Sequence, residues 1–153
     1  MSTIKLKLKE LAEKNMQKDN MIRLIFFLLP VISIVLKGIV FQGFVTSDNP
    51  YSFSFSSGYS AVSIVSMEYY IAFALLFVSF SLLFKGKGRI IYVFVLDIIV
   101  TALFIIDVWY YRGFNTVPSV FLLTQTSNLD NLSDSIKSMV SSLDWLFILD
   151  FVI

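Results

Sequence analysis

Five ionisable residues lie in or beside long apolar stretches of the chain, where a charged side chain is costly to place. They are Lys37, Glu68, Asp97, Asp107 and Asp150. A charge at the centre of a bilayer costs about 2.5–3.5 kcal/mol on insertion scales, so each group needs a partner, water or a route to the interface. Carboxyl and ammonium groups at a common depth can pair with each other or bind a polar ligand. The chemistry expected here is therefore charge pairing or polar binding inside an apolar protein.

The depth of each charge follows from the rise of about 1.5 Å per helical residue. Counted along their own helices, Lys37, Glu68 and Asp150 all fall about 21–24 Å above the inner membrane edge. We expect these three to form an intramembrane ion pair, with Lys37 facing Glu68 first and Asp150 as the other candidate. The alternative is a polar pocket, open to the outer face, that holds a lipid headgroup. Asp97 is expected at a lower level without a basic neighbour, either neutral or bonded to Ser or Thr hydroxyls.

A second group of chemically capable residues lies in the run Asp107–Asn115, which combines an acid, two phenols and a guanidinium. Arginine suits phosphate recognition because its planar fork donates two parallel hydrogen bonds. Tyr110, Tyr111 and Arg112 are therefore candidate contacts for a lipid headgroup. The alternative is an ordinary aromatic belt with one arginine reaching the interface, which would bind nothing in particular.

Helices must position these residues, because the chain contains three apolar runs near the roughly 20 residues that cross a bilayer. The runs are Leu24–Val45, Ala61–Phe84 and Ile90–Val108, and a fourth begins near Asp144. Apolar residues make up 57% of the chain and charged residues 15%, against roughly 45–50% and 25% in soluble domains. The expected fold class is all-α: a polytopic membrane protein with three transmembrane helices and the start of a fourth.

Basic residues are distributed unevenly along the chain. Lysine and arginine gather in residues 1–23 and in Lys85–Arg89, whereas the loop Thr46–Ser60 has neither. The positive-inside rule then predicts a multi-pass protein of the cell membrane with a cytoplasmic N-terminus. Residues 1–23 are expected to form an amphipathic segment on the inner leaflet, and a solvated basic tail is the alternative.

The stretch between the third and fourth runs is neither a span nor a plain polar loop. Within Asn131–Leu143, apolar residues recur at helical spacing between Ser, Asp and Lys. This pattern is typical of a helix that lies in the outer headgroup plane. The fourth run stops at Ile153, before it can span the bilayer, so we expect the chain to be the front part of a longer protein.

The composition also excludes several kinds of site. The chain has no Cys and no His, which removes disulfides, thiol nucleophiles, thiolate metal sites and the commonest general base. A membrane-embedded enzyme could use Asp97, Asp107 and Asp150 as carboxylates, but these residues show neither a paired Asp-Asp nor a metal-ligand spacing. We therefore assign no catalytic, cofactor-binding or metal-binding residue within the chain, and we expect no nucleic-acid partner.

Several short motifs occur in an order that resembles the membrane part of lipoteichoic acid synthases and related phosphoglycerol transferases. The resemblance covers nearly the whole chain from Leu24 onward. The motifs are Leu36-Lys37 in the first span, Phe84-Lys85-Gly86-Lys87 after the second, Tyr110-Tyr111-Arg112-Gly113-Phe114-Asn115 after the third, Gln125-Thr126-Ser127-Asn128 beyond it, and Asp144-Trp145 to Asp150 in the fourth run.

The resemblance implies five spans followed by a large extracellular domain of alkaline-phosphatase/sulfatase fold. That domain would use a threonine nucleophile and a divalent metal, expected to be manganese, to transfer glycerophosphate from phosphatidylglycerol onto a growing cell-envelope polymer. This chain would then be the membrane-anchoring region of the transferase, with phosphatidylglycerol and its own extracellular domain as partners. The alternative is a non-catalytic small membrane module, such as a permease or an assembly subunit, complete in itself.

Overall fold

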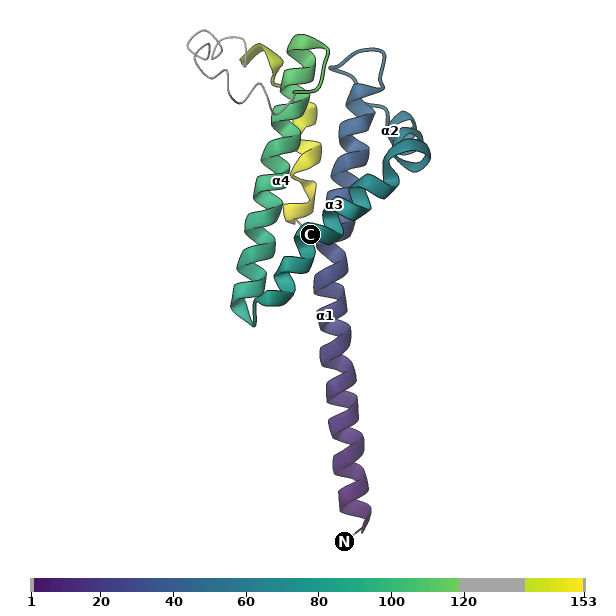
Figure 1. Cartoon of the computed structure of the whole chain (residues 1–153), viewed down its shortest axis with the longest axis vertical. Helices are drawn as coiled ribbons and strands as arrows, with labels where there is room; N and C mark the ends of the chain where they lie inside the picture. Colours follow the sequence, from purple (N-terminus) through teal and green to yellow (C-terminus); the bar gives the residue numbers. More distant parts are fainter. Residues whose placement is uncertain (1, 119–136, 153) are drawn as a thin grey trace.

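The protein is a bundle of helices with one helix extending far beyond the others (Figure 1). The computed structural model describes residues 2–118 and 137–152. Every regular element in these two ranges is helical and none is a strand, so the all-α class is confirmed for the part described. Residues 131–136 of the predicted interfacial segment Asn131–Leu143, together with the Gln125–Asn128 motif, lie outside the described residues, and the interfacial helix stays a prediction.

The longest element is α1, which runs from Ser2 to Val45 without interruption. The predicted N-terminal segment 1–23 and the predicted first span 24–45 thus share one helix, since no Gly or Pro separates them. Pro30 lies inside this helix and does not end it, as membrane helices allow when neighbours satisfy the freed carbonyl. The part from Met16 to Val45 is long and apolar enough to cross a membrane.

The second apolar run does not form the single straight span that its length predicts. The helix α2 (Phe55–Ala61) precedes the run and ends at its first residue. The run itself forms a π-helical turn (Val62–Ser66), α3 (Met67–Ser79) and a 3-10 turn (Phe80–Leu83). The two halves meet at 81°. Ser63 donates to the carbonyl of Ser60 at 3.2 Å, and such serine back-bonding, with the wider π turn, bends helices. The second run is a candidate membrane span only if the two bent halves are counted as a single span.

The helix α4 extends from Lys87 to Phe114 and is the second clear candidate for a membrane span. Gly86 precedes it with φ +56°, a conformation that glycine adopts readily because it has no Cβ. Asn115 ends it in the left-handed region, and its N–H bonds to the carbonyl of Tyr111 at 2.8 Å. The helix is longer than the predicted span Ile90–Val108, so the aromatic run that was expected after the span lies on the helix itself.

The C-terminal run forms two short 3-10 helices, Ser142–Phe147 and Leu149–Val152, where an α-helix was expected to start at Asp144. A capping box begins the first of them. The Ser141 side chain accepts from the N–H of Leu143 at 3.3 Å, and the Asp144 carboxylate accepts from the N–H of Ser141 at 3.0 Å. This segment, yellow in Figure 1, lies beside α4 and packs against α1.

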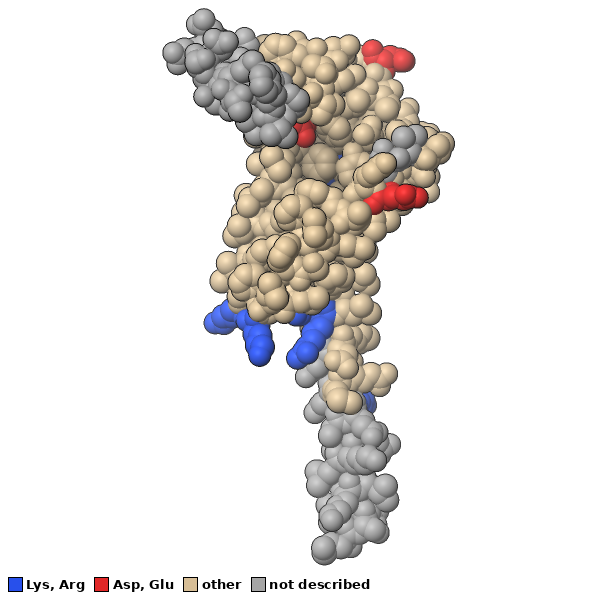
Figure 2. All heavy atoms as spheres, viewed as in Figure 1, with Lys and Arg blue, Asp and Glu red and all other residues tan. Residues whose placement is uncertain are grey.

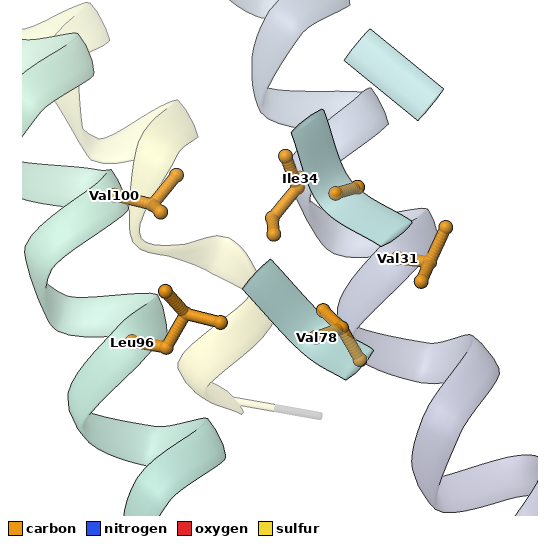
Figure 3. Packing of buried hydrophobic residues seen from close by; sticks show 6 residues of the cluster. Val31, Ile34, Val78, Leu96 and Val100 are labelled. Atoms are coloured by element: carbon orange, nitrogen blue, oxygen red, sulfur yellow. The ribbon is translucent and has the colours of Figure 1, made fainter. Parts of the chain in front are cut away.

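Two apolar clusters hold the helices together. The first joins α1, α3 and α4 through Val31, Ile34, Ala74, Val78, Leu96 and Val100, five of which are labelled in Figure 3. The second joins α1, α4 and the C-terminal segment through Phe41, Phe44, Val108 and Phe147. Because lipid tails are as apolar as these side chains, close packing and polar contacts rather than the hydrophobic effect must stabilise the bundle.

The α2 helix approaches α1 closely because a glycine lies at the crossing. A Cβ placed on Gly58 would overlap the carbonyl oxygen of Ile39 and would lie 2.6 Å from the backbone nitrogen of Gly43. Small residues at helix crossings let membrane helices pack backbone to backbone. Gly58 thus fixes the distance between α1 and the bent second run.

Candidate functional site

A buried lysine stands at the centre of the first polar site, which we call the lysine cluster (Ser33, Lys37, Asp97, Asp150). Lys37 is 3% exposed. Its Nζ atom lies 2.5 Å from Asp97 Oδ1 and 2.7 Å from Asp150 Oδ2. The ion pairs join α1, α4 and the C-terminal segment, so one ammonium group serves two carboxyl groups on two different elements.

Further contacts hold the lysine cluster in place. The Ser33 hydroxyl is within hydrogen-bond reach of both carboxyls, Asp97 at 3.3 Å and Asp150 more closely. A hydroxyl has a single proton, so Ser33 donates to one of them at a time. The Lys37 ammonium also lies 5.2 Å from the centre of the Phe151 ring, within the range of a cation–π contact. Lys37 therefore contacts the C-terminal segment in two ways, through the ion pair with Asp150 and through the ring of Phe151.

The ion-pair partners differ from those expected first. Asp150 lies beside Lys37, but Glu68 has an exposed side chain and makes no ion pair with Lys37 among the described residues. The reason is the 81° break in the second run, which falls just before Glu68 and takes α3 off the straight path that the depth estimate assumed.

Asp97 also has a basic neighbour, where none was expected at its level. Its contact with Ser33 matches the expected hydroxyl bond, but Lys37 contacts it as well. Counting residues fixes the height of a Cα atom above the end of its own helix. It does not give the offset and tilt between two helices, and it neglects the length of a lysine side chain.

A second site, the arginine cluster, lies at the far end of α4 and comprises Arg112, Trp109, Asp144 and the carbonyls of Pro50 and Met139. The Arg112 side chain is fully buried, and Nη1 lies 2.7 Å from Asp144 Oδ1. Nη1 also donates to the carbonyl of Met139 at 2.8 Å, and Nε donates to that of Pro50 at 3.1 Å. The 2.7 Å contact is a charge pair rather than an aligned hydrogen bond, because Asp144 Oδ1 has no aligned donor among the described residues.

Aromatic rings enclose the guanidinium of Arg112. Its central carbon lies 5.1 Å from the centre of the Phe44 ring and 5.3 Å from that of Tyr51. The second carboxylate oxygen of Asp144 accepts from the indole N–H of Trp109 at 2.8 Å. Both distances are within the range of cation–π contacts.

The three candidate headgroup contacts have different surroundings. Arg112 is directed into the protein, although its Nη2 atom has no hydrogen-bond partner among the described residues. The Tyr111 hydroxyl donates to the carbonyl of Val45 at 2.9 Å, and the half-buried Tyr110 stacks on Phe114 with ring centres 4.5 Å apart. The structure thus shows protein contacts for all three, and a headgroup contact by any of them stays a prediction.

Three members of the two clusters were not recognised as site residues from the sequence: Ser33, Trp109 and Asp144. Trp109 belongs to the run Asp107–Asn115, for which an aromatic belt was the alternative, and Asp144 marks the expected start of the fourth run. One usable sequence signal existed for Asp144, since Ser141-x-x-Asp144 has the spacing of a capping box. Ser33 gave no such signal, because a serine inside an apolar run usually bonds to its own helix.

The chemical capacity of the two clusters is limited by these contacts. Both carboxyls of the lysine cluster are engaged by Lys37, and the arginine cluster offers backbone carbonyls and a paired carboxylate rather than a nucleophile beside a base. In residues 2–118 and 137–152, no group of three or more His, Cys, Asp or Glu side chains could hold a metal ion. The geometry of both clusters suits a structural role, in which they hold the helices together.

Comparison with known proteins identifies the family. The sequence model of the lipoteichoic acid synthase N-terminal domain matches residues 5–153, a range that contains both clusters and every described helix from the first turns of α1 onward. No curated protein and no solved structure gives a significant match. The chain therefore belongs to the family of lipoteichoic acid synthase N-terminal domains.

Proposed function

We propose that this chain is the membrane region of a glycerophosphate transferase that uses phosphatidylglycerol to build a cell-envelope polymer. Its part in that reaction is to hold the catalytic part of the enzyme at the outer membrane surface, close to the lipid substrate. The observation that carries the proposal is the family match over residues 5–153. A manganese ion and a threonine nucleophile would belong to that catalytic part and involve no described residue of this chain.

The two clusters support an anchoring role. The ion pairs of the lysine cluster tie α1, α4 and the C-terminal segment together. In the arginine cluster the ion pair joins α4 to the C-terminal segment, and Arg112 contacts α1 through the Phe44 ring. Removing either partner of a buried pair leaves an uncompensated charge, so such pairs resist separation of the helices that carry them. A bundle fastened at its middle and at one end would present a rigid platform to a neighbouring domain.

The proposed orientation puts the N-terminus and the turn before α4 in the cytoplasm, and the arginine cluster on the outer side. Figure 2 supports this arrangement, since lysine and arginine side chains gather at the lower end of the apolar body and carboxylates lie in the upper part of the visible face. The absence of native cysteines allows single-cysteine labelling. Asp48→Cys should react with an impermeant thiol reagent in intact cells, and Lys87→Cys only after lysis. The reverse pattern would overturn the orientation.

The transferase proposal is tested with the full-length protein in proteoliposomes that contain phosphatidylglycerol. Release of diacylglycerol, together with growth of a glycerophosphate polymer, is the expected result. Replacing residues 5–153 by an unrelated anchor with the same number of spans should lower polymer growth while the protein still inserts. If the full-length protein releases no diacylglycerol, the transferase proposal fails, and a non-catalytic membrane module becomes the better account.

A further inference from the structure

The bent segment from α2 to α3 changes direction within the bundle. Its two parts, Phe55–Ile64 and Met67–Leu83, meet at 81°. Figure 1 shows α2 beside the upper part of α1, and α3 sloping from it toward the turn before α4. Since α3 descends along the body of the bundle, α2 is directed sideways rather than across the membrane. The depth of the bend then decides what surrounds α2.

Two lengths indicate that the bend lies near the bilayer surface, on the side of the arginine cluster. Gly58 of α2 crosses α1 against the backbone of Ile39 and Gly43. These two residues lie about 24–30 Å along α1 from Arg23 at the basic end. In the second run, α3 and the 3-10 turn together extend up to about 27 Å. The first length reaches the ~30 Å thickness of the hydrocarbon core and the second approaches it, so α2 lies near the boundary of the core.

Glu68 gives independent support for this depth. Its side chain is exposed, and it makes no ion pair among the described residues. It is the second residue of α3, so it lies within about 3 Å of the bend along the helix. An unpaired carboxylate inside the hydrocarbon core is costly. A bend at the bilayer surface keeps this carboxylate within reach of water and headgroups.

The exposed surface of α2 is divided between aromatic and polar residues. Phe55 and Tyr59 are 57% and 52% exposed, and their rings stack with centres 6.4 Å apart. Ser56 and Ser60 are also exposed, about 100° further around the helix. An aromatic stripe beside a polar stripe is typical of a helix at a bilayer surface, where aromatic rings occupy the headgroup region.

We propose that α2 lies in the headgroup region of the bilayer at the end of the bundle that holds the arginine cluster, with Phe55 and Tyr59 inserted between phospholipid molecules. The partner is the lipid surface itself. Asp48 is the only charged residue in residues 46–67, so burial of the aromatic rings rather than charge attraction holds α2 there. This proposal depends neither on the transferase reaction nor on which side of the membrane that end faces.

The test measures the depth of a nitroxide spin label on the full-length protein in phosphatidylcholine nanodiscs. Single-cysteine variants, with any cysteine outside residues 1–153 replaced, are compared by the ratio of label accessibility to oxygen, which concentrates in lipid, and to a water-soluble nickel chelate. Tyr59→Cys should give a ratio several times that of Ser56→Cys, the matched control on the polar stripe. Asp48→Cys, in an exposed loop, gives the value for water, and Ile98→Cys, exposed near the middle of α4, gives that for the acyl chains.

The ratio at Tyr59 should fall between those at Asp48 and Ile98, and it should not change when phosphatidylserine replaces part of the phosphatidylcholine. Phe55→Cys repeats the measurement if the Tyr59 variant does not fold by circular dichroism. A ratio equal to that at Asp48 would mean that α2 lies in water, and one equal to that at Ile98 that it lies among the acyl chains. Low accessibility to both reagents would mean that another domain or a second copy of the chain covers α2. Each of these three results would overturn the proposal.

Discussion

The lysine cluster and the arginine cluster fasten the same three parts of the molecule, α1, α4 and the C-terminal segment, but by different chemistry. Lys37 is a point charge placed between two carboxyls, and its described polar contacts are to other side chains. Arg112 has a planar guanidinium that donates to two backbone carbonyls, pairs with one carboxylate and makes cation–π contacts with two rings. The first cluster depends mainly on charge balance, and the second mainly on geometry.

This difference predicts how each cluster responds to substitution. Removing charge should disrupt the lysine cluster most, because its helices are joined by the two ion pairs of Lys37. Changing shape at constant charge should disrupt the arginine cluster most, because its contacts require the planar fork. The following variants test that contrast, beginning with the largest expected effect.

Lys37→Ala should lower the free energy of unfolding by about 3–5 kcal/mol, since it leaves two half-buried carboxyls without their buried cation. The measurement is a denaturation curve in mixed micelles. The double variant Lys37→Ala/Asp97→Ala should cost less than the sum of its single changes, because the two residues share one interaction. Glu68→Ala is the control and should stay within about 0.5 kcal/mol of the parent. Strict additivity for Lys37 and Asp97 would mean that they do not interact.

Arg112→Lys should lower the free energy of unfolding by about 2–4 kcal/mol, although the charge is retained. A lysine ammonium cannot reproduce the two carbonyl bonds that Nε and Nη1 of Arg112 donate from separate positions of one planar group. The same denaturation curve measures the effect, and Lys87→Arg is a charge-conserving control at an exposed position outside the cluster. If Arg112→Lys is as stable as the parent, charge rather than the planar fork stabilises the arginine cluster, as we expect for the lysine cluster.

The same variant also bears on the proposed headgroup role of Tyr110, Tyr111 and Arg112. At a temperature at which both proteins remain folded, full-length Arg112→Lys should turn over less phosphatidylglycerol than the parent if the guanidinium contacts a phosphate. Parental turnover in the folded variant would restrict Arg112 to the protein contacts seen here.

Gly58→Ala should cost about 1–3 kcal/mol by overpacking the crossing between α2 and α1. The added methyl group would meet the backbone of Ile39 and Gly43, on the stretch of α1 between Lys37 and the arginine cluster. Thermal unfolding followed by circular dichroism measures the loss. Gly88→Ala is a matched control, because its Cβ would have only an ordinary contact, 3.7 Å from Phe84. A Gly58→Ala protein as stable as the control would contradict the close crossing.

The smallest effects should come from single hydrogen bonds at each cluster. Trp109→Phe removes one bond to the Asp144 carboxylate and should cost about 1–2 kcal/mol. Thr101→Val removes a hydroxyl bond to the carbonyl of Asp97, 2.7 Å long, within a helix that is already bonded, and should cost less. A larger loss of stability from Thr101→Val than from Trp109→Phe would contradict the contrast, in which hydrogen-bond geometry matters more for the arginine cluster than for the lysine cluster.

Sequence reasoning predicted the helical class, and it identified Lys37 and Arg112 as residues that need a partner or a ligand. These features are local, because apolar run length, capping residues and a charge inside an apolar stretch can all be read along the chain. The motif order was also sufficient to indicate the family to which the chain belongs. The same reasoning missed the bend before Glu68, since length alone does not distinguish a straight span from a broken one.

The amino-acid sequence by itself therefore determined the class of protein, the helical stretches and the residues that needed partners. Only the tertiary structure decided which partners they have: Asp97 and Asp150 for Lys37, and Asp144 with two carbonyls for Arg112. The physical reason is that helix offset, tilt and bending arise from packing between residues distant in sequence. A buried charge then pairs with whichever opposite charge this packing brings within reach.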